Sequence, residues 1–104
     1  MLKQRTLRNS IKAVGIGLHT GKNINMELIP SDINTGINFI RTDVDKELII
    51  PAIAENVGDT SLSTALVKND VKISTIEHLL SAIAGLGVDN CLIKVDGPEV
   101  PIMD

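Results

Sequence analysis

A short segment with a single apolar stripe is the strongest structural signal in this sequence. Within residues 74–83, four aliphatic side chains recur at i, i+3, i+4 and i+7, namely Ile76, Leu79, Leu80 and Ile83. This spacing places side chains on one face of an α-helix, so it predicts a short amphipathic helix packed on a core. Gly85 and Gly87 follow, and glycine is typical of a helix end because it accepts the left-handed conformation.

Most of the remaining chain has the pattern of β-strands. Alternating or continuous apolar residues predict strands at 23–30, 37–41 and 89–95, and shorter strands at 47–52 and 62–67. Gly58–Thr60 is predicted to be a loop. Many strands and one helix indicate the α+β class, with a mostly antiparallel sheet and the helix packed on one face.

Composition limits both the core and the partners. Phe39 is the only aromatic residue among 104, so the core must be aliphatic and base stacking on aromatic rings is not expected. The net charge is −3 without a basic run, which gives no support for binding nucleic acid or an anionic membrane surface. No apolar segment reaches the length of a transmembrane helix or resembles a signal peptide, so we expect a cytoplasmic protein without a transmembrane segment.

Cys91 is the only cysteine, which excludes an internal disulfide. It lies in an apolar run, where a buried core thiol is the more common role than a nucleophile or a metal ligand.

The outer face of the predicted helix carries an acid beside an imidazole. At about 100° per residue, Glu77 lies roughly 110° and His78 roughly 150° from the middle of the apolar stripe. Neither side chain therefore belongs to the face that packs on the core. The residues around His78 are small, which suits close approach by a second layer: Ser81, Ala82 and Gly85.

Two interpretations of this pair remain open from the residues alone. Histidine is a common zinc ligand, and a glutamate beside it can act as general base toward a water molecule. Alternatively, Ser74 and Glu77 have the spacing of a capping box, in which both side chains bond to backbone N–H groups at the helix start. His78 is then a plain surface or interface residue.

A glycine-rich loop at residues 15–22 contains the second histidine, His19. Its glycines do not have the spacing of a dinucleotide-binding fingerprint, but they permit close approach of a ligand to the backbone. The chain offers two histidines and one cysteine, but the cysteine is expected inside a strand and no second helix carries a histidine beside an acid. Most ligands of a bound metal would therefore come from elsewhere. Asp43, Asp45 and Glu47 have the pattern of a solvated turn and are assigned no role.

A series of motifs runs in order along the whole chain, at residues 3–7, 15–21, 34–37, 41–43, 54–60, 74–79, 84–90 and 98–104. Two of them read GIGLHTG at residues 15–21 and STIEHL at residues 74–79. In this combination and order the motifs resemble the UDP-3-O-acyl-N-acetylglucosamine deacetylase family, zinc enzymes of bacterial lipid A biosynthesis.

The resemblance implies two similar α+β domains whose helices pack between their sheets, with the active site in the groove where the domains meet. Residues 1–104 then form the N-terminal deacetylase domain, one half of a two-domain α/β sandwich. We expect the chain to be truncated, without the second helix of this domain and without the C-terminal domain.

The resemblance also implies roles for six residues. Glu77 matches the general base and His78 a zinc ligand, while His19 and Leu18 match positions near the polar part and the acyl chain of the substrate. Leu62 and Ser63 match a segment that lines the zinc-side pocket. The other zinc ligands and a histidine acting as general acid lie downstream in the family, outside these residues.

The implied function is zinc-dependent hydrolysis of the N-acetyl group of UDP-3-O-acyl-N-acetylglucosamine, the committed step of lipid A biosynthesis. The implied partners are a UDP-sugar lipid precursor as substrate and the C-terminal domain. We expect residues 1–104 to be inactive alone. The alternative is a non-catalytic binding or interaction module on the same scaffold, in which Glu77 is a helix cap.

Overall fold

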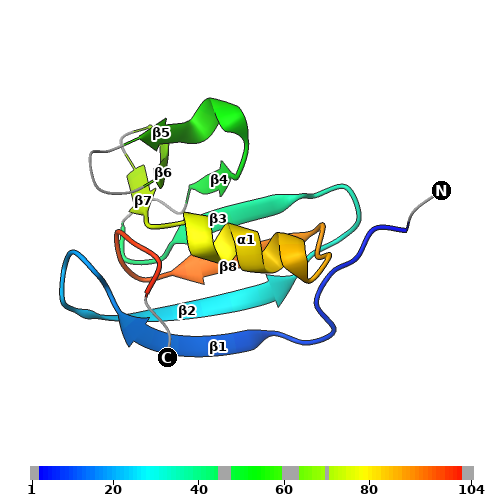
Figure 1. Ribbon diagram of the computed structural model, residues 1–104, viewed down its shortest axis with the longest axis horizontal. Coiled ribbons are helices and arrows are strands. Elements are labelled where there is room, and N and C mark those ends of the chain that lie inside the picture. The colour runs from blue at the N-terminus through cyan, green and yellow to red at the C-terminus, as the bar shows by residue number, and fades with distance from the viewer. Residues whose placement is uncertain (1–2, 45–47, 60–63, 70, 102–104) are drawn as a thin grey trace.

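A five-stranded sheet with α1 lying across one face dominates the structure (Figure 1). The computed structural model describes residues 3–44, 48–59, 64–69 and 71–101. The elements of the larger sheet are β1 (Ile11–Ile16), β2 (Asn23–Pro30), β3 (Ile37–Arg41), β4 (Ile49–Pro51) and β8 (Cys91–Val95). The other elements are the 3₁₀ turn η1 (Ala54–Asn56), β5 (Val57–Asp59), β6 (Thr64–Lys68), β7 (Val71–Ser74) and α1 (Glu77–Gly85).

The larger sheet has the strand order β1-β2-β8-β3-β4. Its neighbouring strands are antiparallel except for β3 and β8, which run parallel. The α+β class, the mostly antiparallel sheet and the helix on one face are therefore confirmed. The predicted strands at 23–30 and 37–41 have the predicted bounds, and the strand predicted at 89–95 begins at Cys91.

A second, three-stranded sheet was not anticipated. It has the order β5-β6-β7 and is antiparallel throughout. The prediction of a loop at residues 58–60 is wrong for Gly58 and Asp59, which pair with Ala65 and Thr64 in this sheet, and Thr60 lies outside the described residues. Glycine weakens a strand only modestly, and pairing with a strongly apolar β6 outweighs that cost.

The core between the larger sheet and α1 is aliphatic, as expected, and surrounds the single aromatic ring of Phe39. Strand alternation directs Ile24 and Met26 of β2 and Ile93 of β8 toward the same side, where all three are buried. The second sheet adds Leu66 and Ile73 to the same cluster. Both sheets and the helix consequently share one core.

Cys91 belongs to this core, with 1% of its surface exposed. Burial raises the pKa of its thiol, which keeps the group neutral. The interpretation as a structural thiol is confirmed.

Arg41, at the end of β3, makes an ion pair within its own segment and a hydrogen bond to the second sheet. The Arg41 guanidinium lies 2.6 Å from the Asp43 carboxylate and also donates from Nη1 to the Lys72 carbonyl of β7 at 3.1 Å. The same guanidinium lowers the pKa of Asp43. Asp43 is thus more than a solvated turn residue, whereas Asp45 and Glu47 lie outside the described residues.

The C-terminal end of α1 is closed by a backbone motif at Gly87, which has a φ of +72°. The N–H of Gly87 donates to Ala84 at 3.0 Å and that of Val88 donates to Ile83 at 3.1 Å. This is the Schellman arrangement, and it confirms that a left-handed glycine ends the helix. In the part of the chain that the structure describes, no helix has the length and apolar character needed to cross a membrane.

Candidate functional site

The first turn of α1 presents His78 on the outer face, as the helical period predicts, whereas Glu77 is half-buried and its Oε2 atom is buried. Ile76 and Ile83 are buried, at 0% and 6% exposure, and Leu79 and Leu80 pack against the same core. His78 is exposed, and so are its small neighbours Ser81, Ala82 and Gly85. The imidazole therefore lies on an outer face that is free of bulky side chains.

The capping-box interpretation of Glu77 is wrong. The residue before the helix is Ile76, which has helical dihedral angles and makes no side-chain capping bond. Ser74 belongs instead to β7, where its N–H donates to Pro98 at 2.8 Å and its carbonyl accepts from Val100 at 2.9 Å. With its backbone fixed beside residues 98–100, Ser74 cannot take the N-cap position.

The junction between β7 and α1 is strained at Thr75, whose φ is +64°. A β-branched residue rarely adopts this left-handed conformation, because its side chain crowds the backbone. The conformation is held by the buried Ile76 on one side and the hydrogen-bonded Ser74 on the other. Strain of this kind is concentrated at functional sites.

Two side-chain oxygens at this junction are buried without a hydrogen-bond partner among the described residues: Thr75 Oγ1 and Glu77 Oε2. An unsatisfied buried oxygen typically costs about 1–3 kcal/mol, so such atoms are uncommon in a finished interior. The carboxylate of Glu77 is therefore available to a donor that the described part of the chain does not supply.

An apolar cavity of about 330 Å³ opens beside His78. It lies between the start of α1, β2 and the C-terminal segment, and its lining comprises Met26, Thr75, His78, Leu79, Ala82, Val100 and Pro101. Among these described lining residues, His78 is the only one with a metal-ligating side chain apart from the thioether of Met26. Within the described residues, no three His, Cys, Asp or Glu side chains gather closely enough to hold a metal ion.

The loop between β1 and β2 carries Leu18 and His19. Leu18 is 58% exposed and His19 is also exposed, so both side chains are open to solvent. The loop closes on itself because Gly17 N–H donates to Lys22 at 2.9 Å and Gly21 N–H donates to Gly17 at 2.9 Å. Glycine is favoured at position 21, where φ is +68°.

Glu99 is the residue of this region that sequence reasoning missed. It is 1% exposed, and its carboxylate accepts hydrogen bonds from the backbone N–H groups of His19 and Thr20 at 3.0 and 2.9 Å. The available signal was an acid inside the otherwise apolar segment 98–102, since a charge in such a segment must find partners.

The structure describes four of the six predicted site residues. Glu77 and His78 begin α1, and Leu18 and His19 occupy the loop after β1. Leu62 and Ser63 lie outside the described residues. In Figure 1 the loop, the C-terminal segment and the start of α1 are at the same end of the larger sheet, and hydrogen bonds of residues 98–100 join them.

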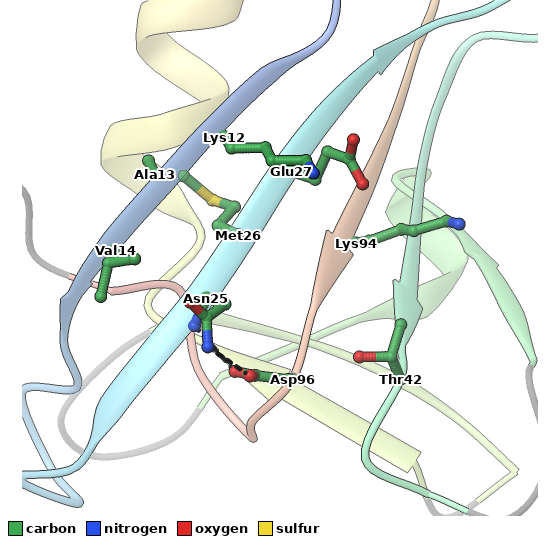
Figure 2. Close-up of a pocket in the computed structure, with 9 residues that line it drawn as sticks. All are labelled: Lys12, Ala13, Val14, Asn25, Met26, Glu27, Thr42, Lys94 and Asp96. Atoms are coloured by element: carbon green, nitrogen blue, oxygen red, sulfur yellow. Dashed lines mark hydrogen bonds between the residues drawn. The ribbon is translucent and has the colours of Figure 1, made fainter.

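A second cavity, of about 460 Å³, lies on the face of the larger sheet opposite α1 and contains none of the predicted site residues (Figure 2). Lys12, Glu27 and Lys94 lie on neighbouring strands in register, so that positive and negative charges alternate across it. Asn25 donates to Asp96 at 2.8 Å. This alternation is typical of a solvated sheet face and favours neither an anion nor a cation.

Comparison with known proteins extends over the whole chain. A family model described as UDP-3-O-acyl N-acetylglycosamine deacetylase matches residues 4–104. The UDP-3-O-acyl-N-acetylglucosamine deacetylases of Hahella chejuensis, Teredinibacter turnerae and Methylococcus capsulatus are 59%, 58% and 59% identical to it over 104 residues. These matches cover 100% of this chain and 34% of each relative, so the chain spans about a third of the length of the curated relatives.

Proposed function

The chain belongs to the UDP-3-O-acyl N-acetylglycosamine deacetylase family, and on that premise we propose that it supplies one half of a zinc-dependent amide-hydrolysing site. The substrate is UDP-3-O-acyl-N-acetylglucosamine, a UDP-sugar lipid precursor of lipid A, which loses its N-acetyl group as acetate. Residues 1–104 form the N-terminal domain, and a second domain supplies the rest of the site. Residues 1–104 alone are inactive under this proposal.

One observation carries the proposal: the buried Oε2 atom of Glu77 has no hydrogen-bond partner among the described residues. A carboxylate used only as a helix cap would be bonded to the backbone at the helix start. A general base, in contrast, needs a free oxygen within reach of a water molecule. The non-catalytic alternative depends on the capping role and has no other account of Glu77.

The donor set also suits zinc. An imidazole nitrogen is a preferred ligand of this ion, and His78 has an exposed ring with small neighbours. A catalytic zinc site usually has three protein ligands, so the second domain contributes the others under this proposal. When bound, zinc polarises the acetamide carbonyl and lowers the pKa of a water molecule to about 7.

Each site residue of this chain then has a separate role. His78 holds the metal through a ring nitrogen, and Glu77 accepts the proton of the attacking water at Oε2. The exposed side chain of Leu18 contacts the acyl chain, while His19 contacts the polar part of the substrate. Leu62 and Ser63 line the pocket on the zinc side.

The two histidines provide a matched experiment in the full-length protein. His78→Ala is expected to weaken zinc binding by at least about 100-fold, because ligand loss exceeds the effect of losing a supporting group. Acetate release should fall with the zinc content. His19→Ala is expected to keep its zinc and to raise KM for the substrate.

Zinc per protein is measured by elemental analysis after dialysis, and acetate release is measured on the same samples. Equal zinc content in the two variants, together with unchanged acetate release by His78→Ala, would falsify the proposed role of His78.

A further inference from the structure

We propose that Glu99 is a positioning residue, which sets the substrate-binding loop against the start of α1. This inference rests on the proposed function for the roles of Leu18 and His19. Its structural part, the attachment of the loop, stands on contacts within this chain.

The side chain of Glu99 holds the loop from the inside of the molecule. Its Oε1 accepts from His19 N–H at 3.0 Å, and its Oε2 accepts from Thr20 N–H at 2.9 Å and from His19 N–H at 3.2 Å. Two successive N–H groups that converge on one carboxylate form an anion-binding nest. The backbone of the loop is thereby fixed, while the side chains of Leu18 and His19 remain exposed.

The backbone of Glu99 belongs to the strand-like segment that fixes the start of α1. Glu99 pairs in parallel with Ser74, and Pro98 and Val100 on either side of it make the two backbone hydrogen bonds with Ser74. Ser74 precedes Glu77 by three residues. One residue therefore links the loop through its side chain and the helix start through its backbone.

Gly17 makes room for this contact. A Cβ atom at this position would lie 2.5 Å from Thr20 Oγ1 and 2.8 Å from both Cδ and Oε2 of Glu99, closer than real Cβ atoms approach such groups. The backbone of the loop therefore packs directly on the carboxylate. Any side chain at position 17 would push the two apart.

Burial of the Glu99 carboxylate costs free energy, so filling space cannot be the reason for a carboxylate at this position. Glu99 is 1% exposed, and burial of an ionised carboxylate is unfavourable unless hydrogen bonds compensate it. An apolar side chain would fill the same space without that cost, but it could not accept from two N–H groups. The carboxylate thus serves to fix the orientation of the loop.

The test is Glu99→Gln in the full-length protein, which preserves side-chain shape but replaces one acceptor oxygen with an amide donor. Because a backbone N–H of the loop loses its charged acceptor, KM for UDP-3-O-acyl-N-acetylglucosamine is expected to rise about tenfold. The change in kcat should stay within about threefold, since Glu77 and His78 are unchanged. Hydrogen exchange at the His19 and Thr20 amides should accelerate.

Glu27→Gln is the matched control, since Glu27 lies on β2 beside Lys12 and Lys94, on the outer face of the sheet. It should leave KM and loop exchange unchanged.

Gly17→Ala tests the same contact from the loop side and is independent of the Glu99 substitution. It should raise KM and accelerate exchange at the same two amides. In the double variant the combined effect should be less than the sum of the two single effects, because both substitutions disturb the contact between the loop and Glu99. If Glu99→Gln does not fold, KM and amide exchange in Gly17→Ala decide whether the loop is held by Glu99.

A purely structural role for Glu99 predicts a different outcome, a lower Tm with unchanged KM and unchanged exchange at His19 and Thr20. That result in a folded variant overturns the proposal. Hydrogen exchange needs no turnover, so the attachment of the loop can be judged even if the zinc-dependent chemistry fails its own test with His78→Ala.

Discussion

The loop after β1 and the first turn of α1 both carry exposed candidate side chains, but they differ in how their polar groups are satisfied. The loop is closed within this chain: its backbone bonds to itself and to the Glu99 carboxylate. The helix start is open, because Ile76 makes no side-chain cap and Glu77 Oε2 has no partner among the described residues. Under the proposed function, this chain therefore completes the substrate-binding loop by itself, while Glu77 and His78 require the second domain.

The largest expected effect concerns Ile76, which holds the start of α1 on the core. Ile76 has 0% exposure directly before Glu77, so Ile76→Ala leaves a cavity under the first turn of α1. We expect a loss of about 2–5 kcal/mol in the free energy of unfolding. Urea denaturation of the full-length protein measures it. A loss below about 1 kcal/mol would show that the helix start is not held by this side chain.

An intermediate effect is expected at Gly21, in the loop after β1. Its φ of +68° is unfavourable for any residue with a Cβ atom, although no atom would contact that Cβ within 4 Å. Gly21→Ala should therefore cost about 1–2 kcal/mol of unfolding free energy from backbone strain alone. Lys22→Ala, an exposed neighbour, serves as the control and should stay within about 0.5 kcal/mol.

The smallest effect is expected at Ser74 and tests whether the helix start is truly uncapped. Ser74→Ala should change the free energy of unfolding by less than about 0.5 kcal/mol, because the backbone bonds of residue 74 are kept. A serine that caps the helix would instead cost about 1 kcal/mol when replaced by alanine. Thermal unfolding of the full-length variant distinguishes the two results, and a clear loss would restore the capping interpretation.

The elements with a strong period could be predicted from the sequence. The stripe from Ile76 to Ile83 gave the helix and the orientation of His78, because burial of one face leaves only one orientation. Gly87 gave the end of the helix, since its left-handed φ suits glycine. Strand β2 could be read from its alternation.

The features that depend on distant contacts could not be predicted. The spacing of Ser74 and Glu77 is that of a capping box, but Ser74 is bound to residues 98–100, far away in sequence. The contact of Glu99 with the loop also joins segments that are far apart in sequence. Local patterns contain no information on such partners, and tertiary contacts override local propensity.

The central claim is that the carboxylate of Glu77 acts as a general base, because its Oε2 has no hydrogen-bond partner among the described residues. Glu77→Gln in the full-length protein tests this claim most directly. Glutamine keeps the size of the side chain but cannot accept a proton from water, so acetate release should fall about 10²–10⁴-fold with zinc content unchanged. Glu55→Gln, an exposed position on η1, is the matched control and should keep full activity. Turnover by Glu77→Gln equal to that of Glu55→Gln would contradict the account.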